Sequence, residues 1–233
     1  MNKKKTNINY PGWELKYFDK SKNFRNYQLD LVKRFIKGVV AEVGPGNGTN
    51  LSYYIKYPKK IDLYEPTKKL FLSLNKNFKK NKKIFIYNKK FFTQKNKYNT
   101  ILYLDVLEHI NEDKKEILKA FQSIKKNGHL IINVPAYSHL FSQFDRDVGH
   151  YRRYDKKYIK KIIKDLKFNK IYLKYYDSIG YFLSLISNIL STNYKKNFDY
   201  KVKVWNFLIP LSKIIDFLIC NLFGKSLLII IKK

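Results

Sequence analysis

A glycine-rich segment follows the first short apolar run of the chain. Val39 to Val43 has the composition of a buried strand, and Gly44-Pro45-Gly46-Asn47-Gly48 comes directly after it. Glycines at alternate positions let the backbone turn tightly, and they let a ligand lie against bare amides at the start of the next helix. The alternative is a tight strand-to-helix connection that binds nothing.

A single acidic residue closes the second apolar run, Ile61 to Tyr64. This residue, Glu65, stands 17 positions after Gly48. A carboxylate at such a place can accept two hydrogen bonds from ribose hydroxyls. The alternative is a solvated acid at a strand end. The spacing is GxGxG rather than GxGxxG, so the dinucleotide fingerprint is incomplete, but the pair still favours a ribose-containing ligand.

Three of the five arginines of the chain lie within eight positions, in the segment Phe144 to Tyr154. Lysine is the usual base of this chain, so arginine here suggests that a planar, bidentate group is required. We expect Arg152 or Arg153 to hold an anionic acceptor and His150 to remove a proton. The predicted acceptor wall consists of Asp145, Arg152, Arg153 and Tyr154. The alternative is a structural cluster of ion pairs with Asp145, Asp147 or Asp155.

The bulk composition excludes several classes of protein. With 45% apolar and 17% aromatic residues among 233, the chain is not a disordered one. The single cysteine, Cys220, excludes an internal disulfide and a multi-cysteine zinc site. No run of about 18 uncharged apolar residues occurs, and the polar N-terminus lacks a secretory signal. These features predict a cytoplasmic protein.

The formal net charge is +30, from 48 basic and 18 acidic residues. Such a charge suggests a nucleic-acid partner or an anionic surface. However, residues with AT-rich codons such as Lys, Asn and Tyr are abundant, whereas Ala, Gly and Pro are scarce. Much of the lysine excess therefore fits codon usage on solvated faces.

Strand and helix patterns alternate along most of the chain. This order predicts βαβ units and a mostly parallel sheet, which binds ligands at the carboxyl ends of its strands. The strands are expected at 39–43, 61–64, 83–87, 100–104, 129–134, 171–176 and 226–231, and the main helices at 23–36, 67–77, 111–126 and 155–166, with Asn111 as an N-cap.

Several segments, in this order, resemble motifs of the class I S-adenosylmethionine-dependent methyltransferases. They are Ala41 to Gly48 with Glu65, Asp105-Val106-Leu107-Glu108-His109-Ile110, Asn127 to Pro135, and Gly224 to Ile231. The sequence Gly149-His150-Tyr151-Arg152-Arg153-Tyr154 is similar to the GHxRRY segment of a bacterial subgroup of these enzymes.

The resemblance implies a Rossmann-like, doubly wound α/β fold. Its seven-stranded sheet is mostly parallel with an antiparallel last strand, and an apolar helical insertion precedes that strand. The expected organisation is a flexible lead-in (1–22), a methyltransferase core (23–176 and 224–233) and an apolar helical insertion or lid (177–223).

The resemblance also implies S-adenosyl-L-methionine as the cofactor. The glycines would face its methionine and ribose parts, Asn88 would replace the usual acid at the adenine, and Arg25 and Tyr27 could reach its carboxylate. The implied cofactor site is Glu42, Gly44, Pro45, Gly46, Asn47, Gly48, Glu65, Pro66, Asn88, Asp105 and Val106. The candidate catalytic residues are His150, His109 and Asp105. No metal is expected, since methyl transfer from a sulfonium requires none and no ligand-like spacing is visible.

The expected function is methyl transfer to a small-molecule or a lipid- or sugar-linked acceptor. The alternatives are a nucleic-acid-binding or RNA-modifying protein, a catalytically silent relative, and a nicotinamide-dependent enzyme. Nucleic acid is not the expected partner, because the Asn/Asp-Pro-Pro-aromatic motif of base-amino methyltransferases is replaced by Asp105-Val106-Leu107-Glu108.

Two segments, 180–191 and 204–223, are too apolar for an ordinary exposed surface. Three arrangements would account for them: packing on the core, packing on a second copy in a homodimer, or contact with an anionic membrane. In the last case the protein would lie peripherally on the inner face of the membrane. The lysines available for headgroups are Lys195, Lys196, Lys201, Lys203 and Lys213.

Overall fold

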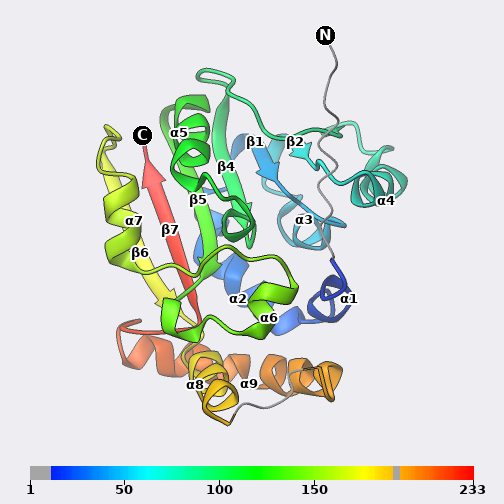
Figure 1. The fold of residues 1–233 in the computed structure, drawn as a ribbon. Helices are drawn as coiled ribbons and strands as arrows, with labels where there is room; N and C mark the ends of the chain where they lie inside the picture. The colour runs from blue at the N-terminus through cyan, green and yellow to red at the C-terminus, as the bar shows by residue number, and fades with distance from the viewer. Residues whose placement is uncertain (1–11, 191–194) are drawn as a thin grey trace.

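Seven strands form one sheet in the order β3-β2-β1-β4-β5-β7-β6 (Figure 1). The computed structural model describes residues 12–190 and 195–233. The strands are β1 Gly38–Val43, β2 Pro58–Tyr64, β3 Ile84–Tyr87, β4 Tyr98–Leu104, β5 Ile124–Pro135, β6 Lys170–Tyr176 and β7 Ser226–Lys232. The predicted Rossmann-like, seven-stranded fold is confirmed.

The last strand, β7, runs antiparallel to both of its neighbours, whereas β1 to β5 pair in parallel. Its first residue, Ser226, pairs with Pro135 at the end of β5 and with Tyr176 at the end of β6. The start of β7 therefore lies at the edge of the sheet where the other strands end.

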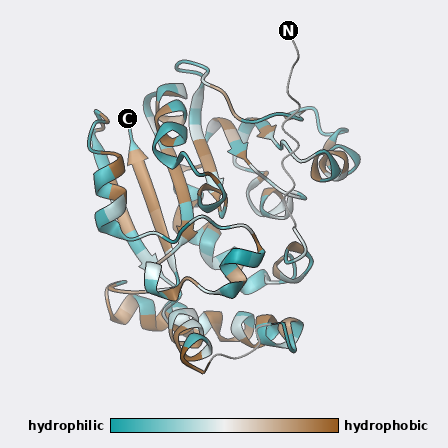
Figure 2. Cartoon of the chain, viewed as in Figure 1, coloured by the Kyte–Doolittle hydropathy of each residue, from teal (hydrophilic) through white to brown (hydrophobic). Residues whose placement is uncertain are grey.

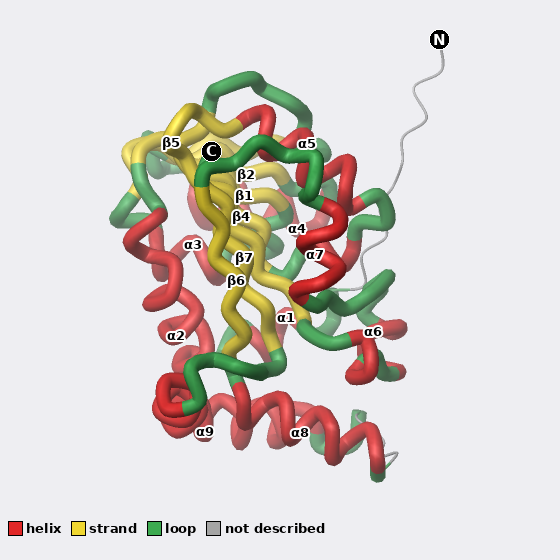
Figure 3. The backbone as a smooth tube through the Cα atoms, turned by 90° about the vertical axis from the view of Figure 1, so that its left-hand side faces the viewer, coloured by secondary structure: helices red, strands yellow, loops and turns green. Residues whose placement is uncertain are grey.

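Helices cover both faces of the sheet (Figures 1 and 3). Their bounds are α1 Leu15–Phe18, α2 Lys22–Val32, α3 Thr49–Tyr54, α4 Lys68–Phe78, α5 Asp113–Ser123, α6 Gln143–Asp147, α7 Lys156–Ile162, α8 Ser178–Ile189 and α9 Phe198–Leu218, with short 3₁₀ turns at Lys33–Phe35, Leu107–His109 and Ser138–Leu140. Alternate residues of each strand feed two cores: Ala41 packs with the apolar sides of α5 and α7, and Val40 packs with those of α2, α3, α4 and α9.

Some predicted boundaries are wrong. The helix expected over 111–126 begins at Asp113 with Glu112 as its N-cap, so Asn111 is not the cap. It ends at Ser123 because β5 already starts at Ile124, where the backbone of residues 127 and 128 pairs with Lys233 at the end of the chain. This pairing with a distant segment overrides the local helical pattern.

Part of the predicted lead-in, residues 1–22, is helical, because it contains α1. Residues 1–11 of the lead-in and residues 191–194 of the predicted insertion lie outside the described residues. Among the described residues, no helix is both long and apolar enough to cross a membrane.

Two buried carboxylates fasten the α8–α9 pair to the rest of the molecule. Asp216 of α9 accepts hydrogen bonds from the Tyr27 hydroxyl (2.8 Å) and from the backbone amides of Asp177 (2.6 Å) and Ser178 (2.9 Å). Asp177 in turn accepts from the indole of Trp205 (2.8 Å). One carboxylate on α9 therefore joins α2 and the β6–α8 corner.

We expect Asp216→Ala to destabilise the protein by at least about 3 kcal/mol, because it leaves three buried donors unsatisfied. Chemical denaturation followed by circular dichroism measures this. The matched control is Asp199→Ala on the same helix, which removes only an exposed pair with Lys203 and should leave the midpoint unchanged. Equal effects of the two substitutions would contradict the assigned role of Asp216.

Candidate active site

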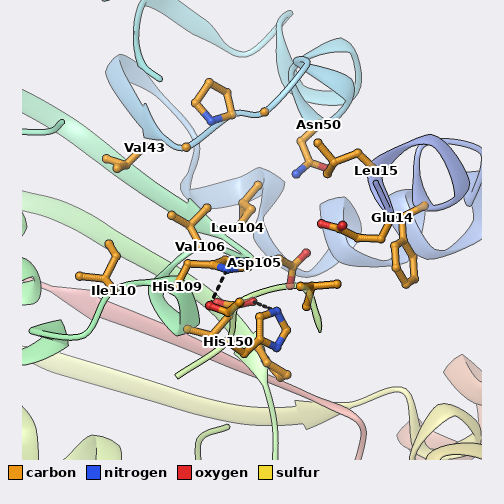
Figure 4. A pocket seen from close by; sticks show the side chains of 18 of the residues that line it. Glu14, Leu15, Val43, Asn50, Leu104, Asp105, Val106, His109, Ile110 and His150 are labelled. Atoms are coloured by element: carbon orange, nitrogen blue, oxygen red, sulfur yellow. Dashed lines mark hydrogen bonds and ion pairs between the residues drawn. The ribbon is translucent and has the colours of Figure 1, made fainter. Parts of the chain in front are cut away.

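A cavity of about 830 Å³ opens at the edge of the sheet where the parallel strands end. Its walls come from the segments that follow β1, β2 and β4, from α1, from α6 and the loop after it, and from the start of β7. Figure 4 shows Val43 and Asn50 at one end of this space and His109, Asp105 and His150 at the other.

The glycine-rich turn forms one wall of the cavity. Gly44 and Gly46 have φ of 66° and 61°, a left-handed conformation that other residues adopt at a cost. A Cβ at Gly44 would also lie 2.8 Å from the Val106 side chain. Glycine is therefore required for the turn to fit against the β4 segment.

The carboxylate of Glu65 is fixed beside this turn. One oxygen accepts from the amide of Gly46 (3.2 Å), and the other accepts from the amide of Thr67 (2.8 Å). Burial raises the pKa of this carboxyl, and the two amides act in the opposite direction. The side chain lines the cavity and holds the two loops in register.

Three of the predicted cofactor residues do not line the cavity. Glu42 is buried and accepts a hydrogen bond from the Tyr54 hydroxyl. The Cα of Gly48 faces Leu74 and Phe78, with no room for a Cβ. Asn88 donates to the backbone oxygens of Glu65 and Pro66. These residues support the turn from behind, whereas Gly44, Pro45, Gly46, Asn47, Glu65, Pro66, Asp105 and Val106 line the cavity.

Asp105 is held at the end of β4 in a left-handed conformation, with φ of 59°. Asn133 donates to one carboxylate oxygen (2.6 Å), and the guanidinium of Arg25 lies 3.4 Å from the other. Asn133 itself accepts from the buried Tyr176 hydroxyl (2.8 Å). The carboxylate is therefore oriented from two sides. Arg25 lines the cavity as predicted, but Tyr27 is turned toward Asp216.

The segment after α6 is organised by one wholly buried carboxylate, Asp145. It receives two hydrogen bonds of 2.9 Å from Arg153 and one of 2.8 Å from Nδ1 of His150. Burial acts to raise the pKa of Asp145, but His150 and Arg153 outweigh it and hold the pKa below its usual range. Arg153 and His150 also line the cavity.

Three of the four residues of the predicted acceptor wall lie outside the cavity lining: Asp145, Arg152 and Tyr154. Arg152 forms an ion pair with Asp113 (2.6 Å) and donates to the backbone oxygen of Asn111 (3.0 Å). The hydroxyl of Tyr154 is buried against Leu107 and Asp113. Arg152 therefore follows the alternative prediction, in which it takes part in an ion pair and does not bind the acceptor. Its partner is Asp113 and not one of the expected partners, Asp145, Asp147 or Asp155.

Two parts of the cavity lining were not predicted from the sequence. Lys225, just before β7, lines it, and its Nζ lies 4.4 Å from the centre of the Trp205 ring. Within the described chain, Nζ makes no hydrogen bond or ion pair, and burial lowers the pKa of Lys225. An antiparallel last strand must begin at the ligand edge, which is the signal that could have found it. Helix α1 also lines the cavity, through Leu15 and Phe18.

The sequence predicts no metal site, but the structure brings three possible metal ligands together. Candidate ligand atoms of Glu108, His109 and His150 all lie within 4.8 Å of one another. The first two follow β4, and His150 arrives on the loop after α6, about 40 positions later, so no short motif announces the group.

Comparison with known proteins matches the part of the chain that contains most of the residues lining the cavity. A family model described as "Methyltransferase domain" matches residues 19–173. No sequence among the curated proteins matches the chain.

Several solved structures share the fold. Phosphoethanolamine N-methyltransferase 2 of Haemonchus contortus, in complex with S-adenosyl-L-methionine, has a TM-score of 0.65 at 15% identity, covering 94% of this chain and 57% of its own. The chain thus spans little more than half of that enzyme. A SAM-dependent methyltransferase of Archaeoglobus fulgidus has a TM-score of 0.62 at 13% identity, covering 97% and 100% of the two chains. The N-methyltransferase NodS of Bradyrhizobium japonicum has a TM-score of 0.57 at 11% identity, covering 91% and 96%.

Glu42 provides a test of the buried support beneath the turn. Burial raises its pKa from 4.5 to about 7, so the folded protein holds a proton that the unfolded chain releases. Stability should therefore fall as the pH rises from about 4.5 to about 7, by at most about 3 kcal/mol. Glu42→Gln keeps an acceptor for Tyr54 and removes this loss.

The measurement is the difference in unfolding free energy between variant and wild type at pH 5 and pH 8. We expect Glu42→Gln to gain stability relative to wild type only at the higher pH. The matched control is Glu112→Gln, at an exposed position on the same edge of the sheet. A difference that does not change with pH would contradict the burial argument.

Proposed function

The chain belongs to the family whose methyltransferase domain matches residues 19–173, and on that premise we propose that it transfers a methyl group from S-adenosyl-L-methionine. The acceptor is a small molecule or a lipid- or sugar-linked compound. The observation that carries this proposal is the convergence of the Gly44–Gly46 turn, Glu65 and Asp105 on one cavity.

The residues present fit this donor. The bare turn at Gly46 admits a close backbone approach, and each oxygen of Glu65 retains acceptor capacity for a ribose hydroxyl beyond its one amide partner. When bound, the donor supplies a methyl group made electrophilic by a positive sulfur. The carboxylate of Asp105, fixed by Asn133, provides a negative charge at the reacting end of the cavity.

The acceptor side is formed by His109, His150 and Lys225. Burial, and then the nearby His150, lower the pKa of His109 to about 3, so its ring is neutral at pH 7. A neutral imidazole offers a lone pair to its surroundings in addition to its one N–H. The ammonium of Lys225 could bind an anionic group of the acceptor. From the sequence, Arg152 or Arg153 was expected to bind that group.

Calorimetry with S-adenosyl-L-methionine and S-adenosylhomocysteine tests the donor site. We expect binding to the wild type, and a 10- to 100-fold loss in Glu65→Ala, because hydrogen bonds to a charged group contribute about 1.5–3 kcal/mol. Asp165→Ala, at an exposed acid that is not part of the cavity lining, is the control. Absence of wild-type binding at millimolar ligand would refute the donor assignment.

We propose in addition that the outer face of the α8–α9 pair lies on an anionic membrane. Helices α8 and α9 form a layer at one end of the molecule (Figures 1 and 3), and much of both helices is coloured as hydrophobic in Figure 2. Phe207 and Phe217 are 78% and 80% exposed. The exposed apolar residues of this face are Phe182, Leu183, Ile186, Ile189, Leu190, Phe207, Leu211, Ile214, Phe217, Leu218 and Leu222.

Charge favours a membrane over a second copy of the chain. An exposed apolar face of this size marks an interaction surface. The lysines expected to meet headgroups lie on or beside these helices: Lys195, Lys196, Lys201, Lys203 and Lys213. Three of them, Lys195, Lys203 and Lys213, form ion pairs with Asp147, Asp199 and Asp30. A dimer formed through this face would bring together two chains that each carry a net charge of +30 and repel each other, whereas anionic headgroups would attract the chain. The proposed location is therefore peripheral, on the inner face of the membrane.

Flotation with vesicles tests this surface. We expect the wild type to float with vesicles that contain phosphatidylglycerol and not with neutral ones. Phe207→Ser/Phe217→Ser should bind at least about tenfold more weakly, since inserting each ring contributes on the order of 1 kcal/mol or more. Leu72→Ser/Leu118→Ser, at exposed apolar positions on other helices, is the control. Equal binding to neutral vesicles, or a dimer that the double Phe variant dissociates, would overturn the membrane proposal.

A further inference from the structure

The two histidines at the acceptor end of the cavity are oriented by their outer nitrogens. Nδ1 of His150 lies 2.8 Å from a carboxylate oxygen of Asp145, and Nδ1 of His109 lies 3.2 Å from the carbonyl oxygen of Gly149. Carboxylates and carbonyls only accept, so both Nδ1 atoms carry the hydrogen. In a neutral ring Nε2 then carries the lone pair, which is the arrangement found in metal-bound histidines.

Glu108 supplies a carboxylate to the same place. Its side chain is 1% exposed, and Oε2 has no hydrogen-bond partner among the residues that the structure describes. The other oxygen lies 3.9 Å from Nε2 of His150. An unpartnered carboxylate oxygen in a cavity wall is costly unless a cation approaches it. Arg153 donates to both oxygens of Asp145 through Nε and one terminal nitrogen, and its other terminal nitrogen makes no hydrogen bond among the described residues.

We propose that Glu108, His109 and His150 bind one divalent transition-metal ion at the acceptor end of the cavity. Two imidazoles and one carboxylate suit Mn²⁺, Fe²⁺, Co²⁺ or Zn²⁺ and leave coordination positions open. The candidate ligand atoms, within 4.8 Å of one another, need only a small closure to reach one ion. Asp145 and Gly149 act as positioning groups for the rings.

An ion at this place specifies the acceptor chemistry, and this part rests on the proposed methyl transfer. Open positions beside the reacting end favour an acceptor that offers an oxygen ligand, and a metal lowers the pKa of a bound hydroxyl. The acceptor class is therefore a hydroxyl-bearing compound methylated on oxygen. Its hydroxyl would release its proton to solvent, and the oxygen would bond to the methyl carbon as the carbon–sulfur bond breaks and neutral S-adenosylhomocysteine leaves.

Metal titration of the full chain tests the site. The purified protein is freed of metal with a chelator and titrated with Mn²⁺, and electron paramagnetic resonance measures the free ion. We expect one ion per chain at micromolar affinity, and at least a tenfold loss in Glu108→Gln and in His150→Gln. His139→Gln, which alters an exposed histidine hydrogen-bonded to Tyr181, should match the wild type. Absence of saturable binding up to millimolar Mn²⁺, or unchanged affinity in Glu108→Gln, would overturn the site.

A second measurement avoids variants that fail to fold. The wild type loaded with one equivalent of Cu²⁺ should show nitrogen superhyperfine splitting from two imidazoles, and a spectrum without nitrogen ligands would overturn the assignment. S-adenosylhomocysteine calorimetry on the metal-free chain separates the two proposals. Nucleoside binding without metal binding removes only the ion site, whereas metal binding without nucleoside binding removes the proposed methyl transfer and leaves the ion site.

Discussion

The direction of the strands is the constraint on which the cavity depends. Parallel strands β1, β2, β4 and β5 must all end at one edge of the sheet, so the loops that follow them meet there. The glycine turn, Glu65 and Asp105 each occupy the first positions after a strand. Strand β7 is antiparallel, so it begins at the edge where the other strands end, and Lys225 just before it lies at that edge.

Buried carboxylates turn this shared edge into a defined site. Asp145 collects Arg153, His150 and the start of α6, where Ser142 donates to it through both its amide and its hydroxyl. Charge in a buried place is costly, and it is tolerated here because every oxygen of Asp145 is engaged by donors. The acceptor side is thus held by charge pairing, whereas the donor side is held by backbone turns and amide hydrogen bonds.

Local patterns predicted the fold and the donor side, but contacts between distant segments decided the rest. The glycine turn and Glu65 could be recognised because each follows its own strand in sequence. The role of Arg152 depends on Asp113, 39 positions earlier, and the meeting of Glu108 with His150 depends on the path of α6. For the same reason, the pairing of residues 127 and 128 with Lys233 extended β5 over a segment whose composition favours a helix end.

The distribution of charge argues for a cationic donor over a polyanionic partner in the cavity. Across the chain, basic residues outnumber acidic ones by 48 to 18. The cavity lining reverses this ratio, with seven acidic residues against six basic ones. Two of those bases, Arg25 and Arg153, already face carboxylates. The lining carries a formal charge of −1 within so basic a chain, and this suits the sulfonium donor and the proposed divalent cation better than a polyanionic backbone. The excess of lysine is therefore a property of the rest of the chain, and it agrees with the proposed contact with anionic headgroups.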